Sequence, residues 1–118
     1  MILQIVFFET QSGSRPVEKY IESLENDRAE AVLSQIEQLS ILGLWGISPK
    51  MIKTVSGIHY LRIKDRKGIH RVFFTIESRK ILLLLHAYLK KEQKLKNSEI
   101  ELAKARYKEW RSRHERFL

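Results

Sequence analysis

The sequence predicts an α+β domain with a four-stranded antiparallel sheet, an N-terminal helical hairpin and a C-terminal helix, in the order β-α-α-β-β-β-α. Two patterns carry most of this prediction. Three short apolar segments with alternating side chains follow one another at 58–64, 70–76 and 81–88, and two earlier segments have apolar residues at helical spacing. We expect the helices to pack on one face of the sheet and to leave the other free. All 118 residues, 1–118, are interpreted as a single domain.

The first part of the chain predicts one strand and two helices. Residues 1–8 are apolar and form the expected first strand. Ser14 is the expected N-cap of a helix with Pro16 in its first turn, since both residue types favour helix starts. A second helix is predicted between Asp27 and Gly43, because glycine commonly ends helices. The apolar stripes of the two helices indicate a hairpin that covers a sheet.

The rest of the chain predicts a connector, a meander of strands and a long helix. Residues 44–57 are expected to be irregular because they contain breakers: Gly46, Pro49 and Gly57. The polar links 65–68 and 77–80 are typical of hairpin turns, so the three strands that they join should be antiparallel neighbours. Residues 98–114 predict a helix with one basic side and one apolar side, formed by Ile100, Ala103, Tyr107 and Trp110.

Alternation gives the predicted strands two different faces. One face is apolar and should meet the helices: Leu61, Ile63, Val72, Phe74 and Ile76. The other is basic and aromatic: Tyr60, Arg62, Lys64, Arg71 and Phe73. Strict alternation in the last strand puts His86, Tyr88 and Lys90 on one side, together with Leu82 and Leu84. We expect the three polar residues to join the basic face and form a shallow surface there.

The amino-acid composition limits the classes of partner that the protein is expected to bind. The net charge is +8, with 3 basic and 7 acidic residues in 1–48 but 19 basic and 7 acidic residues in 49–118. Such a field favours a polyanion, and nucleic acid fits better than a membrane, although a solvated basic surface explains the charge equally well. The absence of cysteine excludes thiolate metal sites and is compatible with a cytoplasmic protein. The apolar start is too short for a signal peptide or a membrane span.

The basic face is suited to RNA. Aromatic rings among cations are typical of single-strand binding. RNA cleavage without a metal needs a base for the 2′-hydroxyl, cations for the phosphate and an acid for the leaving oxygen. His86 has a suitable intrinsic pKa, and Arg62 and Arg71 could clamp a phosphate. Structural roles stay open: His86 as a hydrogen-bonded strand residue, Tyr88 as packing, and the two arginines as partners of Asp65 or Glu77.

Four segments, in order and at family spacing, resemble the RelE/ParE toxin superfamily, in particular its HigB-like, phage-derived branch. They are residues 12–17 with 20–24, Lys53 with 57–62, residues 70–74, and residues 84–91 with Ile100 and Ala103. The resemblance covers nearly the whole chain. It places Arg71 on the family's phosphate-stabilising arginine and Arg62 and Lys64 on basic strand positions. The terminal active-site strand is matched by His86, Tyr88, Lys90 and Lys91.

The resemblance implies the toxin of a type II toxin–antitoxin system: a metal-independent endoribonuclease without a cofactor that cuts messenger RNA in the A site of the 70S ribosome. It also implies a small antitoxin, expected to be a helix-turn-helix DNA-binding protein. The expected catalytic residues are Arg62, Arg71, His86 and Tyr88, and the expected RNA-binding residues are Lys53, Lys64, Phe73, Lys90 and Lys91. Two alternatives remain, a gyrase inhibitor like the ParE branch and a non-catalytic, phage-derived interaction protein.

Overall fold

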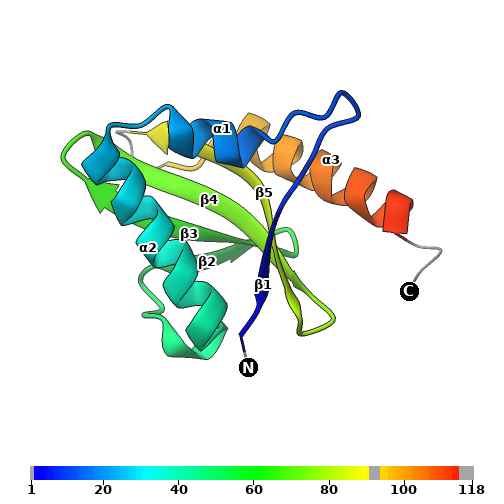
Figure 1. Cartoon of the computed structure of the whole chain (residues 1–118), viewed down its shortest axis with the longest axis horizontal. Helices are drawn as coiled ribbons and strands as arrows, with labels where there is room; N and C mark the ends of the chain where they lie inside the picture. The colour runs from blue at the N-terminus through cyan, green and yellow to red at the C-terminus, as the bar shows by residue number, and fades with distance from the viewer. Residues whose placement is uncertain (1, 91–93, 115–118) are drawn as a thin grey trace.

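The computed structural model describes residues 2–90 and 94–114 and has one mixed sheet with helices on both faces. The α+β class is confirmed. In chain order the elements are β1 (Gln4–Phe7), α1 (Pro16–Glu22), α2 (Asn26–Leu42), the 3₁₀ turn η1 (Leu44–Gly46), β2 (Ile52–Val55), β3 (Ile58–Asp65), β4 (Gly68–Glu77), β5 (Ile81–Lys90) and α3 (Asn97–His114). In Figure 1, α1 lies across the top of the view, α2 runs down the left side, and α3 extends to the right.

The predicted sheet of four antiparallel strands is wrong in two respects. The sheet has five strands in the order β1-β5-β4-β3-β2, because part of the expected connector, Ile52–Val55, pairs with β3. In addition, β1 runs parallel to β5, with Gln4 opposite Ile81 and Phe7 opposite Leu84. The two predicted hairpins are confirmed, since β3, β4 and β5 are antiparallel neighbours.

Local signals at the turns and helix ends mostly agree with the structure. Gly43 follows α2 with a φ of 71°, which an L side chain rarely adopts. Gly68 ends the β3–β4 turn, and a Cβ atom there would lie 2.7 Å from the carbonyl oxygen of Lys90. The predicted cap at Ser14 is wrong, because α1 begins one residue later, with Arg15 at the cap position and no side-chain cap.

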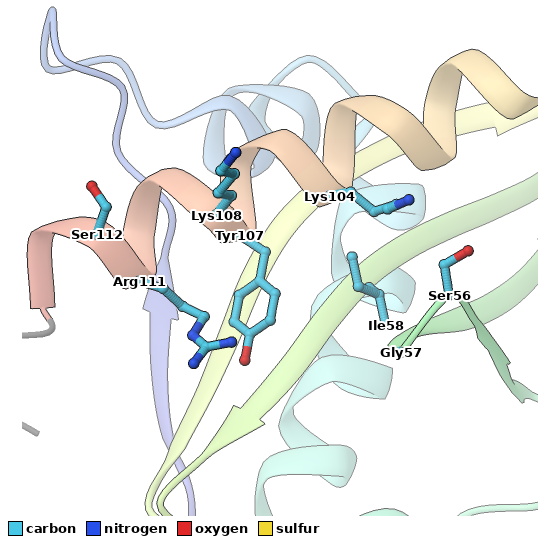
Figure 2. Close-up of a pocket in the computed structure, with 8 residues that line it drawn as sticks. All are labelled: Ser56, Gly57, Ile58, Lys104, Tyr107, Lys108, Arg111 and Ser112. Atoms are coloured by element: carbon cyan, nitrogen blue, oxygen red, sulfur yellow. The ribbon is translucent and has the colours of Figure 1, made fainter.

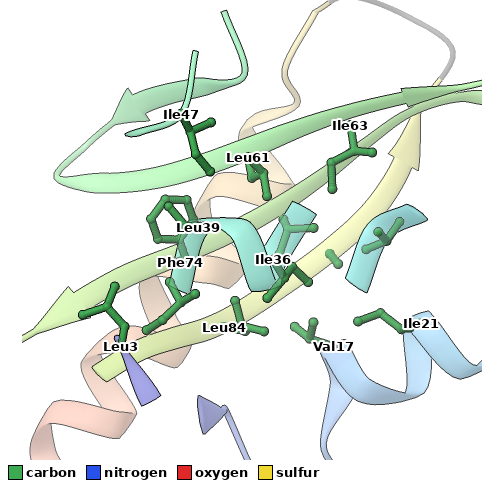
Figure 3. Packing of buried hydrophobic residues seen from close by; sticks show 14 residues of the cluster. Leu3, Val17, Ile21, Ile36, Leu39, Ile47, Leu61, Ile63, Phe74 and Leu84 are labelled. Atoms are coloured by element: carbon green, nitrogen blue, oxygen red, sulfur yellow. The ribbon is translucent and has the colours of Figure 1, made fainter. Parts of the chain in front are cut away.

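Two apolar cores lie on opposite faces of the same strands. The first is formed by α1 and α2 against the sheet and includes Val17, Ile36, Leu61, Phe74 and Leu84 (Figure 3). The second is formed by α3 and includes Phe73, Leu83, Leu85, Ala103 and Trp110. The expectation that all helices share one face is therefore wrong, since α3 covers the face that was expected to be free.

A β-bulge in β5 changes which residues face α3. Phe73 of β4 lies opposite His86, but the next residue, Phe74, lies opposite Leu84, so Leu85 is an extra residue in β5. Before the bulge, Leu82 and Leu84 face α1 and α2; after it, Ala87 takes that side and Tyr88 faces α3. The strict alternation predicted for this strand is wrong for that reason, whereas the expected grouping of His86 and Tyr88 with Arg71 is correct.

The C-terminal end of α2 leaves large apolar side chains exposed. Trp45 in η1 is 100% exposed, and Ile41 and Leu42 are more than half exposed. Trp110, by contrast, is buried and stacks on His114 with ring centroids 4.2 Å apart. The second tryptophan is thus a core residue, as expected, while Trp45 is outside both cores.

Candidate active site

Cross-strand pairing brings the predicted catalytic residues together in two adjacent rows. Arg71 of β4 lies between Arg62 of β3 and Tyr88 of β5 in one row. In the next row Phe73 lies between Tyr60 and His86. Antiparallel pairing places such neighbours on one face at contact distance, so residues far apart in sequence form one cluster.

The α3 side of this cluster is covered. Arg71 is 1% exposed and Phe73 0%, and His86 and Tyr88 are 9% exposed each. The rings of Phe73, His86 and Tyr88 stack in pairs with centroids 5.7 to 6.3 Å apart. The shallow open surface expected here is therefore wrong for these four residues. Neither Arg71 nor Phe73 has surface for a ligand in this arrangement.

The guanidinium of Arg71 lies against the ring of Tyr88. Its guanidinium carbon lies 5.8 Å from the centroid of the Tyr88 ring, a cation–π distance. Burial raises the pKa of the Tyr88 hydroxyl above its ordinary value, and the adjacent Arg71 charge opposes part of that effect. Tyr88 is consequently a protonated hydroxyl at neutral pH and can act as a proton donor.

Two residues of α3 hold the imidazole of His86. Nε2 of His86 pairs with the Glu99 carboxylate, and Nδ1 lies 3.1 Å from Nη1 of Arg106. Arginine only donates hydrogen bonds, so Nδ1 is the acceptor and Nε2 carries the hydrogen toward Glu99. Arg106 also donates to the carbonyl oxygen of Leu85 at 3.0 Å, which fixes its position beside the bulge.

The charge state of His86 follows from these contacts. Burial lowers the pKa of His86 and Arg106 lowers it further, while Glu99 raises it; the net effect is a pKa below the ordinary value. His86 is therefore neutral at pH 7 with one defined tautomer. A neutral imidazole oriented by a carboxylate is the state that general-base catalysis requires.

Next to the covered cluster, part of the basic face is open. Arg62 and Lys64 of β3, with Lys50, line a hollow of about 320 Å³ whose apolar side is formed by Met51 and Ile69. Arg62 is half-buried, and Lys64 is exposed. These cations can bind phosphate groups beside the row formed by Tyr60, Phe73 and His86.

The remaining predicted RNA-binding lysines lie around this open surface. Lys53 is exposed on β2 opposite Tyr60, and Lys90 is half-buried opposite Ile69. Lys91 lies outside the described residues. The structure thus places the lysines at the rim and the aromatic residues inside.

Sequence reasoning missed Glu99 and Arg106. Neither is among the predicted site residues, and the helix predicted at 98–114 was assigned only a basic side and an apolar side. Their role depends on which face of the sheet α3 covers, and no local pattern reports that. The spacing of seven residues, two helical turns, does place both on one side of α3.

A second polar cluster lies on the opposite face and joins α1 and α2 to the β3–β4 hairpin. His70 is fully buried; its Nδ1 lies 2.6 Å from the Tyr20 hydroxyl and its Nε2 lies 2.6 Å from Asp65 Oδ2. The same oxygen accepts from Nε of Arg28 at 2.8 Å. Burial raises the pKa of Tyr20 to about 12, whereas Arg28 and His70 hold the pKa of Asp65 far below its usual range. His70 thus lies on the face of the sheet that α1 and α2 cover, and its contacts join these helices to the β3–β4 hairpin.

The chain is similar to a known protein family over most of its length. The model of one family, described as phage derived protein Gp49-like (DUF891), matches residues 19–108, which is more than half of the chain and includes every residue of the two rows as well as Glu99 and Arg106. No curated protein matches the sequence. Within residues 2–90 and 94–114, no group of three or more metal-ligating side chains gathers, and no helix has the length and apolarity to cross a membrane.

Proposed function

Because the chain belongs to the Gp49-like family of phage-derived proteins, a family of the RelE/HigB-like toxin type, we propose that it is the toxin of a type II toxin–antitoxin pair, of the HigB-like branch. The proposed activity is ribosome-dependent cleavage of messenger RNA in the cytoplasm. The observation that carries it is His86, whose imidazole is held in one orientation and one tautomer by Glu99 and Arg106 beside the row of Arg62, Arg71 and Tyr88.

In the proposed reaction, a ribose 2′-hydroxyl replaces Arg106 as the donor to Nδ1 of His86. The imidazole takes the hydroxyl proton as the oxygen attacks the neighbouring phosphorus, and Glu99 stabilises the imidazolium that forms. Tyr88 gives its proton to the 5′-oxygen that leaves. The products are a 2′,3′-cyclic phosphate and a free 5′-hydroxyl, so no water or metal enters the step.

The cations divide into two roles in this proposal. Arg62 and Lys64 line the open hollow and hold the phosphate. Lys53 and Lys90 contact the RNA beside it, and Lys91, which lies outside the described residues, keeps its predicted RNA-binding role. Arg71 is buried and acts through Tyr88, whose position and pKa it affects. A positively charged rim accelerates encounter with RNA and makes binding salt-dependent.

The test compares two histidine variants. Expression of the wild-type chain in a bacterial host should stop growth and produce messenger RNA cuts within translated codons, mapped by sequencing of 5′ ends. His86→Gln should lower cleavage about 100-fold or more in a translation extract, since general base catalysis contributes on that order. His59→Gln is the matched control, because His59 lies on the other face and bonds Thr54. A folded His86→Gln protein that cleaves as fast as the control would contradict the assignment.

Arg62→Ala tests the phosphate role without disturbing the core. Arg62 is half-buried at the open hollow, whereas removal of the fully buried Arg71 would affect folding as well as chemistry. We expect Arg62→Ala to retain its thermal unfolding midpoint and to lose at least about tenfold in cleavage, in line with the loss of a charged hydrogen bond.

One observation favours a second candidate, a non-catalytic interaction protein: both nitrogens of His86 are bonded to α3. The same expression experiment separates the candidates. Growth arrest with intact messenger RNA would favour protein binding, and accumulation of DNA breaks would favour gyrase as the target. The cognate antitoxin, which we propose to be a helix-turn-helix protein, should restore growth in each case.

A further inference from the structure

A hollow of about 460 Å³ separates the β2–β3 turn from α3 (Figure 2). It contains none of the residues of the candidate active site. Ser56 and Gly57 of the turn line one side, and the side chains of α3 line the other. Ligand pockets in proteins commonly have volumes of about 300–1,000 Å³, so the hollow has room for a small ligand or one residue of a polymer.

The wall formed by α3 is cationic. Lys104, Lys108 and Arg111 line the hollow at spacings of four and three residues, which places them on neighbouring turns of one helix. No described residue that lines it is acidic. Nζ of Lys104 lies 3.5 Å from Oε1 of Glu101, but both side chains are substantially exposed. Ion pairs between exposed side chains are weak, so Glu101 neutralises little of the charge of Lys104. The hollow therefore attracts an anion.

The floor is apolar and aromatic. Ile58 is 2% exposed, and the half-buried ring of Tyr107 projects from α3 toward the sheet (Figure 2). The Tyr107 hydroxyl donates to the Glu77 carboxylate at 3.1 Å, which fixes the ring. The guanidinium of Arg111 lies 5.7 Å from the centroid of this ring. A fixed aromatic ring among cations is the combination that binds an unpaired nucleotide.

The β2–β3 turn leaves room for a ligand to approach its backbone closely. Ser56 and Gly57 have φ values of 50° and 78°, which form a tight connection between β2 and β3. Among the described residues, apart from Gly57 and its two chain neighbours, no heavy atom lies within 4 Å of the point where a Cβ of Gly57 would be. A ligand on the floor can thus approach the backbone of the turn, and the hydroxyl of Ser56 is available beside it.

We propose that this hollow binds one nucleotide of single-stranded RNA, with the phosphate on Lys104, Lys108 and Arg111 and the base on the ring of Tyr107. The inference rests on the proposed function, because it gives the RNA a second contact remote from the cleavage site. A toxin with two such contacts holds its substrate strand at two points and fixes which phosphate reaches His86.

The experiment uses a fluorescent single-stranded RNA of 12 nucleotides with 2′-O-methyl groups, which cannot be cleaved by 2′-hydroxyl attack. Anisotropy titrations over a series of salt concentrations compare the wild type with the triple variant Lys104→Gln, Lys108→Gln and Arg111→Gln. We expect a loss of affinity of tenfold or more and a salt slope smaller by about 0.7, since the hollow holds one phosphate and each phosphate contact on a single strand contributes ~0.7.

The matched control removes three exposed cations elsewhere: Lys19→Gln, Arg79→Gln and Lys80→Gln. It has the same net charge as the pocket variant and should lose less than threefold in affinity. Equal losses in the two triple variants would mean that only net charge matters and would overturn the pocket.

Two single variants test the aromatic floor. Tyr107→Ala should weaken RNA binding about fivefold or more through lost stacking, whereas Tyr107→Phe keeps the ring and should bind like the wild type. Thermal unfolding midpoints identify any variant that has lost its fold. In an amide NMR titration with the same RNA, the wild-type signals of Ser56 and Gly57 should shift; unchanged signals there would place the RNA elsewhere and overturn the inference.

Cleavage by the same preparations separates this inference from the proposed function. A wild type that cuts messenger RNA while the pocket variant binds RNA like the control would overturn the pocket alone. A wild type that cuts nothing while the pocket variant specifically loses RNA affinity would leave the pocket standing and remove the nuclease.

Discussion

At the level of single residues, His86 owes its chemistry to two opposite charges on α3. Glu99 favours the charged imidazole and Arg106 disfavours it, and burial tips the balance toward the neutral form. Sequence reasoning found the histidine, because a polar residue at the end of an apolar strand is conspicuous. It did not find the two partners, since their contact with His86 depends on tertiary packing.

The two partners should shift the pKa of His86 in opposite directions. Glu99→Gln removes the stabilising charge and should lower the pKa further, whereas Arg106→Met removes the opposing charge and should raise it. Side-chain NMR titration of the histidine measures both. Shifts of the same sign in the two variants would show that loosened packing, rather than charge, dominates.

The buried cluster around His70 should contribute substantially to stability. Asp65 accepts hydrogen bonds from both His70 and Arg28, so Asp65→Asn should cost about 3 kcal/mol in urea unfolding. The exposed pair of Asp27 and Arg66 offers a control, and Asp27→Asn should cost far less than Asp65→Asn, because ion pairs between exposed side chains contribute little to stability. Similar costs for both would contradict the structural role of the cluster.

The same carboxylate predicts a pH dependence. The folded-state pKa of Asp65 is depressed, so its stabilisation is complete above its unfolded pKa of about 3.8 and is lost as the pH falls toward the folded value. Wild-type stability should therefore fall more steeply below about pH 4 than that of Asp65→Asn. Parallel acid limbs in thermal unfolding curves would rule out this linkage.

At the level of elements, α3 completes the second core and forms half of the candidate site. Ala103 is fully buried and Ala105 is exposed on the opposite side of the same helix. Ala103→Glu forces a charge into the core and should lower the free energy of unfolding by about 3 kcal/mol or more, while Ala105→Glu should change it by less than about 0.5. Denaturant unfolding of the two variants measures the difference; a mild effect at Ala103 would mean that α3 docks loosely.

Elements with strong local signals were predictable, and elements defined by distant partners were not. The hairpins of β3, β4 and β5 follow from alternation and short polar links, and Gly43 marks the end of α2. Strand β2 has only four residues, two of them the exposed Lys53 and Thr54, so it lacks an apolar pattern. The parallel pairing of β1 with β5 joins segments more than 70 residues apart, which periodicity cannot report.

The candidate site was also predictable only where it depends on local strand pairing. Hairpin register alone pairs Arg62 with Arg71. The pairing of Arg71 with Tyr88 depends on the bulge at Leu85, because the register that starts with Glu77 opposite Ile81 would otherwise put Ala87 opposite Arg71. Whether the row is open depends on α3, whose apolar stripe fits either face of a sheet equally well. The burial of Arg71 and Phe73 was missed for that reason.

At the level of the whole molecule, both cores share the strands β3, β4 and β5, so the protein should unfold as one unit. Leu83 and Leu84 are both fully buried on β5 but face opposite cores. Leu83→Ala and Leu84→Ala should each cost about 2–5 kcal/mol. Unfolding followed by far-UV and near-UV circular dichroism should give coincident transitions in both variants; separate transitions would show that the two faces unfold independently.

The contrast between the two tryptophans gives the molecule its own optical probes. Trp45 is fully exposed at the end of α2, and Trp110 is buried against His114 in α3. Emission from Trp45 is accessible to a dissolved quencher such as iodide, while Trp110 is protected from it by the surrounding side chains. A protein that covers the α2 end would shield Trp45 from the quencher and leave Trp110 unchanged, whereas a ligand on α3 would leave the quenching of Trp45 unchanged. The unlabelled protein can thus report whether a partner covers the α2 end.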